Sequence, residues 1–166
     1  APSQNSMIVV SDARSRVVDY SDVYEYSYDY STYSSSVDGY DAEGQLTSAL
    51  QYVTKADSEL PVIYEITGHG ENALSGGFPE AVEKANMTVS QLTLLTEDAV
   101  PDDAAAIIIN GPTSDLSEDD AAKVKDYLQG GGRALIACNF EYQDLPNFAS
   151  VLEAYGIERV AGIVME

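Results

Sequence analysis

The chain has 166 residues, enough for one domain with a core of its own and a small appendage. Eight Lys and Arg residues stand against 28 Asp and Glu residues, and the formal net charge of −20 argues against nucleic acid and anionic membrane surfaces as partners. The sequence contains no apolar run long enough to insert into a bilayer. One cysteine and one histidine exclude an internal disulfide, a Cys-rich zinc site and a multi-histidine metal site, so we expect no metal and no cofactor.

The first 40 residues are rich in tyrosine, serine and aspartate and predict a small β appendage. MIVV and RVVDY predict short strands around the turn SDARS. In YEYSYDY the tyrosines recur at every second residue, so an extended strand places four rings on one face. These rings could form an aromatic platform for a sugar or a peptide. We favour the plainer alternative, an edge strand whose tyrosines lie against the domain, followed by a mobile STYSSS turn.

Helices and strands alternate from residue 41 onward. Leu46, Ala49, Leu50 and Val53 have the spacing of an amphipathic helix. The further predicted elements are a strand VIYEIT, a helix from about Phe78 to Ala85, strands TVSQLTLL and AAIIIN, a helix capped by Ser117 and ended by Gly130 with Asp120 as its capping-box acid, a strand RALIAC, a helix over 146–155 and a strand RVAGIV.

Continuous apolar strands separated by amphipathic helices predict a parallel sheet that is covered on both faces. We therefore expect an α/β fold: a three-layer, flavodoxin-like, doubly wound and mostly parallel sheet over residues 41–166, with an N-terminal β appendage over residues 1–40. Five strands with right-handed crossovers suggest the order 2-1-3-4-5. The strands around Ile63, Ile108 and Ile136 should then be parallel neighbours and fully buried.

Two loops should meet where the strand order reverses, which is where ligands bind in such sheets. They are TGHGE, after the first core strand, and NGPTSD, after the third. Glycines there allow close backbone approach, and imidazole, carboxylate and amide groups can hydrogen-bond a ligand. The predicted ligand-binding residues are Thr67, Gly68, His69, Gly70, Glu71, Asn110, Gly111 and Asn139. Neither loop has the pattern of a phosphate-binding loop. The alternative is that His69 only braces the neighbouring loop.

Cys138 ends a predicted strand but lacks the small neighbours of a nucleophile elbow, so we expect a buried, inert thiol and no catalytic residue. Two alternatives stay open. One is a degenerate hydrolase or amidotransferase-like enzyme in which His69 is the base and Glu71 orients it. The other is a scaffold in which the tyrosine strand pairs with another subunit's edge.

Four segments carry a resemblance that covers about residues 42–166: EGQLTSALQYVT, PVIYEITGHGE, VPDDAAAIIINGPTSDLSEDDAAKVKDYLQGGGRALIA and LPNFASVLEAYGIERVAGIVME. Together they resemble the GldG-like auxiliary proteins of ABC-type transport systems. The resemblance implies a sheet similar to that of class I glutamine amidotransferases without their catalytic machinery. It also implies an extracytoplasmic domain, anchored at the cell membrane by segments outside this chain, whose partners are the membrane subunits of an ABC transporter. We therefore expect a non-catalytic domain that binds a partner, a small polar ligand or a glycan.

Overall fold

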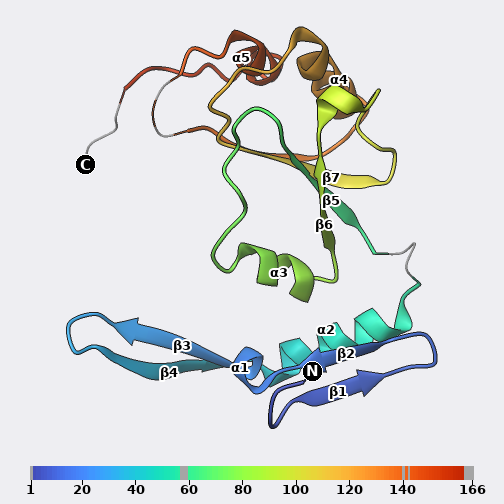
Figure 1. The fold of residues 1–166 in the computed structure, drawn as a ribbon, viewed down its shortest axis with the longest axis vertical. Coiled ribbons are helices and arrows are strands. Elements are labelled where there is room, and N and C mark those ends of the chain that lie inside the picture. Colours follow the sequence, from blue (N-terminus) through green and yellow to red (C-terminus); the bar gives the residue numbers. More distant parts are fainter. Residues whose placement is uncertain (1, 57–59, 140, 142, 163–166) are drawn as a thin grey trace. The chain divides into compact units, whose positions relative to one another are not determined.

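The computed structural model describes residues 2–56, 60–139, 141 and 143–162. Contacts divide the chain into two compact units (Figure 1). The first comprises Ala1–Leu60 and Glu80–Asn86, and the second comprises Pro61–Pro79 and Met87–Glu166. The helix that follows the predicted appendage therefore groups with that appendage and not with the parallel sheet.

The first unit contains two antiparallel hairpins and one long helix. Its elements are β1 (Met7–Val10), β2 (Ser15–Val18), the short helix α1 (Tyr20–Val23), β3 (Tyr24–Asp29), β4 (Ser34–Tyr40) and α2 (Ala42–Thr54). The predicted strands on either side of SDARS are confirmed, and they pair as an antiparallel hairpin. Helix α2 packs against this hairpin, and Val18, Val23 and Ala49 form a small buried cluster.

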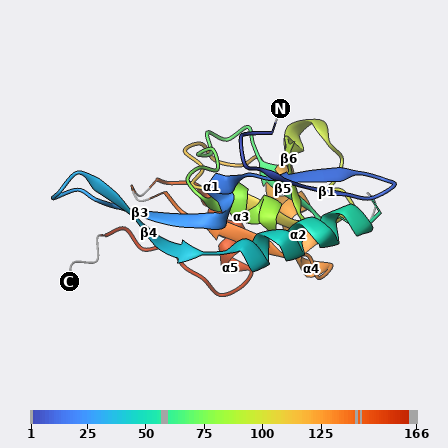
Figure 2. The same ribbon diagram turned by 90° about the horizontal axis from the view of Figure 1, so that it is seen from below.

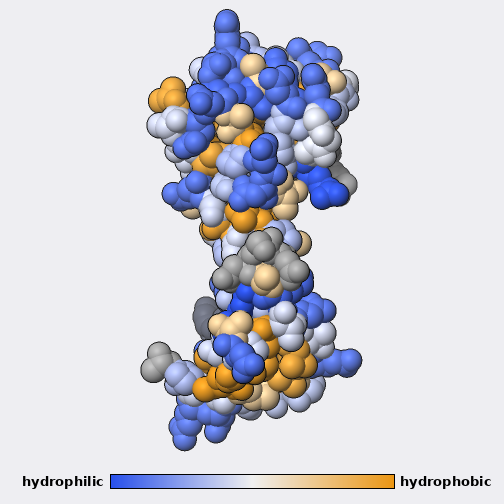
Figure 3. All heavy atoms as spheres, turned by 90° about the vertical axis from the view of Figure 1, so that its right-hand side faces the viewer, coloured by the Kyte–Doolittle hydropathy of each residue, from blue (hydrophilic) through white to orange (hydrophobic). Residues whose placement is uncertain are grey.

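The outer face of the β1–β2 hairpin keeps apolar side chains in solvent. Ile8, Val10 and Val17 are exposed there, although alternate residues of the same strands face α2. Figure 3 shows hydrophobic side chains gathered on the surface of this unit. A two-stranded hairpin has only one face covered by α2, so the other face stays open.

The tyrosine-rich segment forms the second hairpin, which extends away from β1, β2 and α2 (Figures 1 and 2). The predicted extended strand is confirmed as β3, but half of STYSSS belongs to strand β4 and is not a turn. The prediction that the tyrosines lie against the domain holds for half-buried Tyr24 but is wrong for Tyr26, Tyr28 and Tyr30, which are 56%, 49% and 80% exposed. Strand β3 pairs with β4 alone, so no further layer of this unit covers the rings.

The second unit is built on a four-stranded parallel sheet with the order β6-β5-β7-β8. The strands are β5 (Val62–Ile66), β6 (Thr88–Leu92), β7 (Ala104–Asn110) and β8 (Ala134–Ala137), and the other elements are the 3₁₀ turn η2 (Leu94–Thr96), α4 (Glu118–Gln129) and α5 (Pro146–Glu153). Helix α3 (Phe78–Lys84) lies between β5 and β6 in the chain, but from Glu80 onward it belongs to the first unit. The α/β fold and the order 2-1-3-4 of its first four strands are confirmed.

Helices α4 and α5 lie together on one face of this sheet (Figure 1). Ile66, Ile107 and Ile109 of the sheet pack in one buried cluster with Val124 of α4 and Phe148 of α5. As predicted, Ser117 caps α4, because its hydroxyl accepts a hydrogen bond from the Asp120 N–H at 3.0 Å. Burial of this one cluster is the main hydrophobic stabilisation of the unit.

The expected fifth strand is not formed over residues 159–162, and the rest of RVAGIV lies outside the described residues. Among the described residues, β8 is therefore an edge strand of the sheet. The predicted parallel neighbours are confirmed and Ile63 and Ile108 are buried, but the prediction that Ile136 is fully buried is wrong. The neighbouring Leu135 is 53% exposed, because an edge strand lacks a partner on one side. No helix of the described residues is long and apolar enough to cross a membrane.

A net charge of −20 opposes the compact state of this chain by self-repulsion. Raising NaCl from about 0.1 to about 1 M shortens the Debye length from about 10 to about 3 Å, so the midpoint of thermal unfolding should rise by roughly 5 °C. Circular dichroism checks this. The control variant Asp102→Lys/Glu153→Lys, changed at two exposed positions, should show a smaller rise, and a midpoint that does not respond to salt would contradict the argument.

Candidate functional site

The two predicted loops meet at the carboxyl ends of β5 and β7, the neighbouring strands at which the order reverses. Backbone hydrogen bonds join them. The carbonyl of His69 accepts from the N–H groups of Thr113 and Ser114 at 3.0 and 2.8 Å, and the N–H of Asn72 donates to the carbonyl of Asn110 at 2.8 Å. The loops are thus a single hydrogen-bonded structure.

The imidazole of His69 lies between two carboxylates. Its Nδ1 is 3.0 Å from Oε1 of Glu71, and its Nε2 is 3.2 Å from Oδ2 of Asp120, the third residue of α4. The second oxygen of Glu71 accepts from the His69 backbone N–H at 2.8 Å. His69 is 8% exposed and Asp120 is 1% exposed, so this cluster is shielded from water.

Both imidazole contacts are hydrogen bonds only when each ring nitrogen carries a proton, because an ionised carboxylate can only accept. A neutral imidazole can therefore donate to only one of the two carboxylates at a time. Burial by itself would raise the pKa of Asp120, but hydrogen bonds from Ser117 and His69, together with the charges of His69 and Lys123, outweigh it and lower that pKa below 3.8. The start of a helix also favours a negative charge at this position.

Lys123 lies one turn further along α4, where its ammonium group is close to the carboxylates of Asp119 and Asp120. Its ammonium donates to the carbonyl of Leu94 at 2.9 Å and pairs with Asp119 at 2.6 Å, and it lies 3.6 Å from Oδ1 of Asp120. The hydrogen bond to Asp119 and the two nearby carboxylates raise the pKa of Lys123. This lysine is thus committed to structural contacts.

The structure brings all eight predicted residues to this edge of the sheet, but it leaves few of their polar groups open. The Thr67 hydroxyl lies 3.0 Å from that of Thr93, the Asn110 amide donates to the Asn72 carbonyl at 2.8 Å, and buried Gly111 donates to the Ala137 carbonyl at 2.9 Å. Gly68 and Gly70 are exposed, and Asn139 lies half-buried beside Gly111. Their role in ligand binding stays a prediction.

The close contact between the two loops requires a glycine at position 70. It adopts a φ of +72°, and a Cβ added there would lie 2.1 Å from the Thr113 hydroxyl. A larger side chain would thus strain the backbone and push the NGPTSD loop away.

Sequence reasoning missed Asp120 as a partner of His69 and predicted a capping-box role for it. The carboxylate contacts the imidazole instead. The available signal was its spacing from Val124 and Tyr127, because residues four and seven positions apart share a helix face and both pack on the sheet side of α4.

The prediction that Cys138 is buried is wrong, because the cysteine is exposed. It directly follows β8, and no further strand of the described part of the chain pairs with β8 on that side. Strand β7 separates β8 from β5, so Cys138 and His69 leave strands about 10 Å apart. No metal-binding group of three or more His, Cys, Asp or Glu side chains occurs among the residues that the structure describes.

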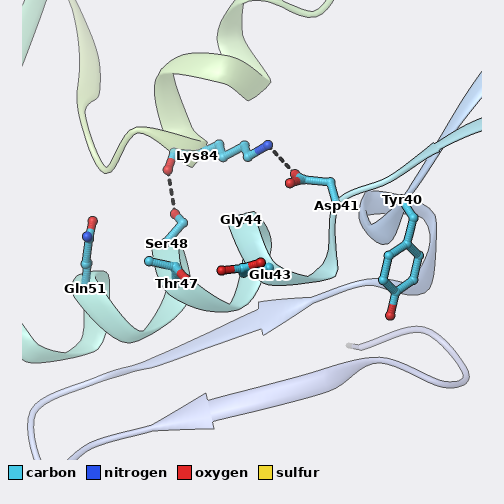
Figure 4. A pocket seen from close by; sticks show the side chains of 8 residues that line it. All are labelled: Tyr40, Asp41, Glu43, Gly44, Thr47, Ser48, Gln51 and Lys84. Carbon is cyan, nitrogen blue, oxygen red and sulfur yellow. Dashed lines mark hydrogen bonds and ion pairs between the residues drawn. The ribbon is translucent and has the colours of Figure 1, made fainter.

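A polar pocket of about 590 Å³ lies along α2 in the first unit (Figure 4). Its lining residues are Tyr40, Asp41, Glu43, Gly44, Thr47, Ser48, Gln51 and Lys84. Lys84 pairs with Asp41, and Ser48 donates to the Lys84 carbonyl. The sequence did not predict this pocket, although polar residues occupy the face of α2 opposite its apolar stripe.

Comparison with known proteins adds no relative: no family model, no curated protein and no solved structure matches this chain. The resemblance to GldG-like proteins stays a prediction.

We predict that Asp120→Asn lowers the free energy of unfolding by about 2 kcal/mol at pH 7, because the buried hydrogen bond to the imidazole loses the negative charge of its acceptor. The native pKa of Asp120 is lowered, so its contribution is present above the unfolded value near 3.8 and disappears as the pH falls through the native one. The difference between wild type and variant, measured by urea unfolding, should therefore shrink below pH 4. Asp119→Asn, at the exposed neighbouring position, should change stability by less than about 1 kcal/mol. Equal effects of the two changes would contradict the buried cluster.

We also predict that Cys138 reacts with a maleimide in the native protein. The reagent should label one thiol per chain at nearly the rate seen in denaturant, because the side chain is exposed. Cys138→Ser should change the free energy of unfolding by less than about 0.5 kcal/mol. Labelling that occurs only after unfolding would show that the thiol is covered.

Proposed function

We propose that this chain is a non-catalytic, extracytoplasmic binding domain of an auxiliary protein in an ABC-type transport system. The resemblance to GldG-like proteins motivates the system and the location. The lack of catalysis is supported by one observation, the enclosure of the His69 imidazole between Glu71 and Asp120.

A catalytic histidine needs one ring nitrogen directed at the substrate. Contact of Nδ1 with Glu71 is the pairing that the alternative hydrolase requires, but Nε2 would then have to reach a substrate or a nucleophile. In this cluster Nε2 faces the carboxylate of Asp120, which is itself buried. This geometry favours a bracing role for His69 over general base catalysis.

The loops also offer little to stabilise an anionic transition state. Neither TGHGE nor NGPTSD contains Lys or Arg, and nearby Lys123 is already paired with Asp119. What the loops expose is glycine backbone and the polar side chains of Asn72, Thr113 and Ser114. Such groups suit a neutral polar ligand, such as a sugar, or the surface of a membrane subunit of the transporter.

The absence of catalysis is tested by measuring enzymatic turnover. Wild type and His69→Ala are incubated with amide, ester and glycoside substrates, and we expect neither protein to exceed the buffer rate. Binding is measured in the same preparations by an NMR titration with a panel of neutral mono- and disaccharides. We expect shifts at Gly68, Gly70 and Thr113 that weaken in Thr113→Ala, an exposed position.

Turnover by wild type that His69→Ala abolishes would replace this proposal by the hydrolase. Saccharides that bind without shifting the loop signals would remove the predicted ligand site. Asp120→Asn is the control for a loss of folding in His69→Ala, because it keeps the imidazole and removes only the charge of its partner.

A further inference from the structure

The β3–β4 hairpin presents a row of aromatic rings on one face. The register places Tyr24 opposite Tyr40, Tyr26 opposite Val37 and Tyr28 opposite Ser35, so these side chains share a face. We call this surface the tyrosine face. Apart from half-buried Tyr24, its tyrosines and Val37 are exposed. A soluble protein rarely leaves such a continuous surface open unless something binds there.

The hairpin is ordered by its own contacts. The carboxylate of Asp29 accepts from the Ser31 N–H, the Ser31 hydroxyl and the Thr32 hydroxyl at 2.6–2.8 Å, which holds the turn between the strands. These hydrogen bonds lower the pKa of Asp29 to about 2, so the group stays charged at neutral pH. Ring contacts at 5.4 Å between Tyr24 and Tyr40, and at 5.0 Å between Tyr28 and Tyr30, align the aromatic side chains.

The sequence around the tyrosine face is acidic, and the nearby cation Lys84 pairs with Asp41 beside Tyr40. From Val17 to Thr54 the chain contains seven Asp and Glu residues and no Lys or Arg. Glu25 and Asp29 alternate with the tyrosines and therefore lie on the reverse face of β3. They are too far around the strand for direct pairing, but they lie within about one Debye length of 8 Å and add a negative potential to the aromatic surface.

We propose that the tyrosine face of the β3–β4 hairpin is a docking surface for an extended, arginine-containing segment of a partner protein. Guanidinium groups stack on tyrosine rings and are attracted by nearby carboxylates, so they match both properties of the hairpin. Tyrosine and serine also dominate the surfaces with which antibodies bind proteins, because they give large contact areas at a small loss of side-chain entropy.

The spacing of the rings sets the form of the segment. Alternate residues of a strand lie about 6.8 Å apart, so Tyr24, Tyr26 and Tyr28 repeat at that distance. An extended peptide with arginine at every second position repeats at the same distance and can place a guanidinium on each of the exposed rings of Tyr26 and Tyr28. A neutral glycan could also stack on the rings, but it gains nothing from the acidic surroundings.

This inference does not rest on the proposed function, because it uses only residues of the first unit. The probe is the capped peptide Arg-Thr-Arg-Thr-Arg-Thr-Arg, titrated at 0.15 M NaCl and followed by fluorescence anisotropy. Wild type should bind it more tightly than the equally charged lysine peptide, and should not bind the peptide with glutamine in place of arginine.

Tyr26→Ser/Tyr28→Ser keeps the charge and should weaken binding about tenfold, while Tyr26→Phe/Tyr28→Phe should retain it. The role of charge is tested with two double variants that each remove two negative charges from exposed positions. Glu25→Gln/Asp38→Asn changes the hairpin, and Asp102→Asn/Glu153→Gln changes the second unit. Only the hairpin pair should weaken binding, by about threefold.

Several results would overturn the proposal. They are no binding of the arginine peptide, equal binding by wild type and the serine variant, or equal weakening by the two charge variants, which would mean attraction to the whole acidic protein. Displacement of the peptide by a neutral oligosaccharide would assign the tyrosine face to a glycan instead. If the serine variant loses the hairpin signals in NMR spectra, Tyr26→Leu/Tyr28→Leu replaces it, since leucine keeps the apolar volume and removes the ring.

Discussion

The second unit depends on one buried imidazole that connects three segments of the chain. His69 bonds to Glu71 in its own loop, to Asp120 at the start of α4 and, through its carbonyl, to the loop after β7. Removing the imidazole would leave the buried carboxylates of Glu71 and Asp120 without this contact, which is a costly defect. The cluster therefore stabilises the carboxyl edge of the sheet.

The same loop is tied to α5. Asp115 accepts hydrogen bonds from the first N–H groups of that helix at Asn147 and Phe148, and Asn147 donates to the Leu116 carbonyl. The free N–H groups of a helix start are thus satisfied by a neighbouring loop and not by the helix itself. Polar residues that suggest a ligand site are, for the most part, parts of this internal framework.

The two units contrast in how they use their polar and aromatic residues. The second unit turns its histidine and the carboxylates of Glu71 and Asp120 inward, and the side chains exposed in its two loops, Asn72, Thr113 and Ser114, are neutral. The first unit turns most tyrosines of β3 outward on a hairpin that is held by its turn, by its strand pairing and by the packing of Tyr24 at its base. A chain with a net charge of −20 can keep such an aromatic surface in solution, because like charges oppose self-association.

The sequence by itself determined the alternation of elements, the parallel order of four strands and the two loops that meet at the edge, because continuous apolar strands and amphipathic helices leave few arrangements. Only the tertiary structure decided that Asp120 contacts His69 across 51 positions of sequence, that β8 is an edge which exposes Leu135 and Cys138, and that the tyrosines face solvent. Local patterns specify which side chains share a face, whereas burial depends on whether another segment covers that face, and no local pattern carries that information.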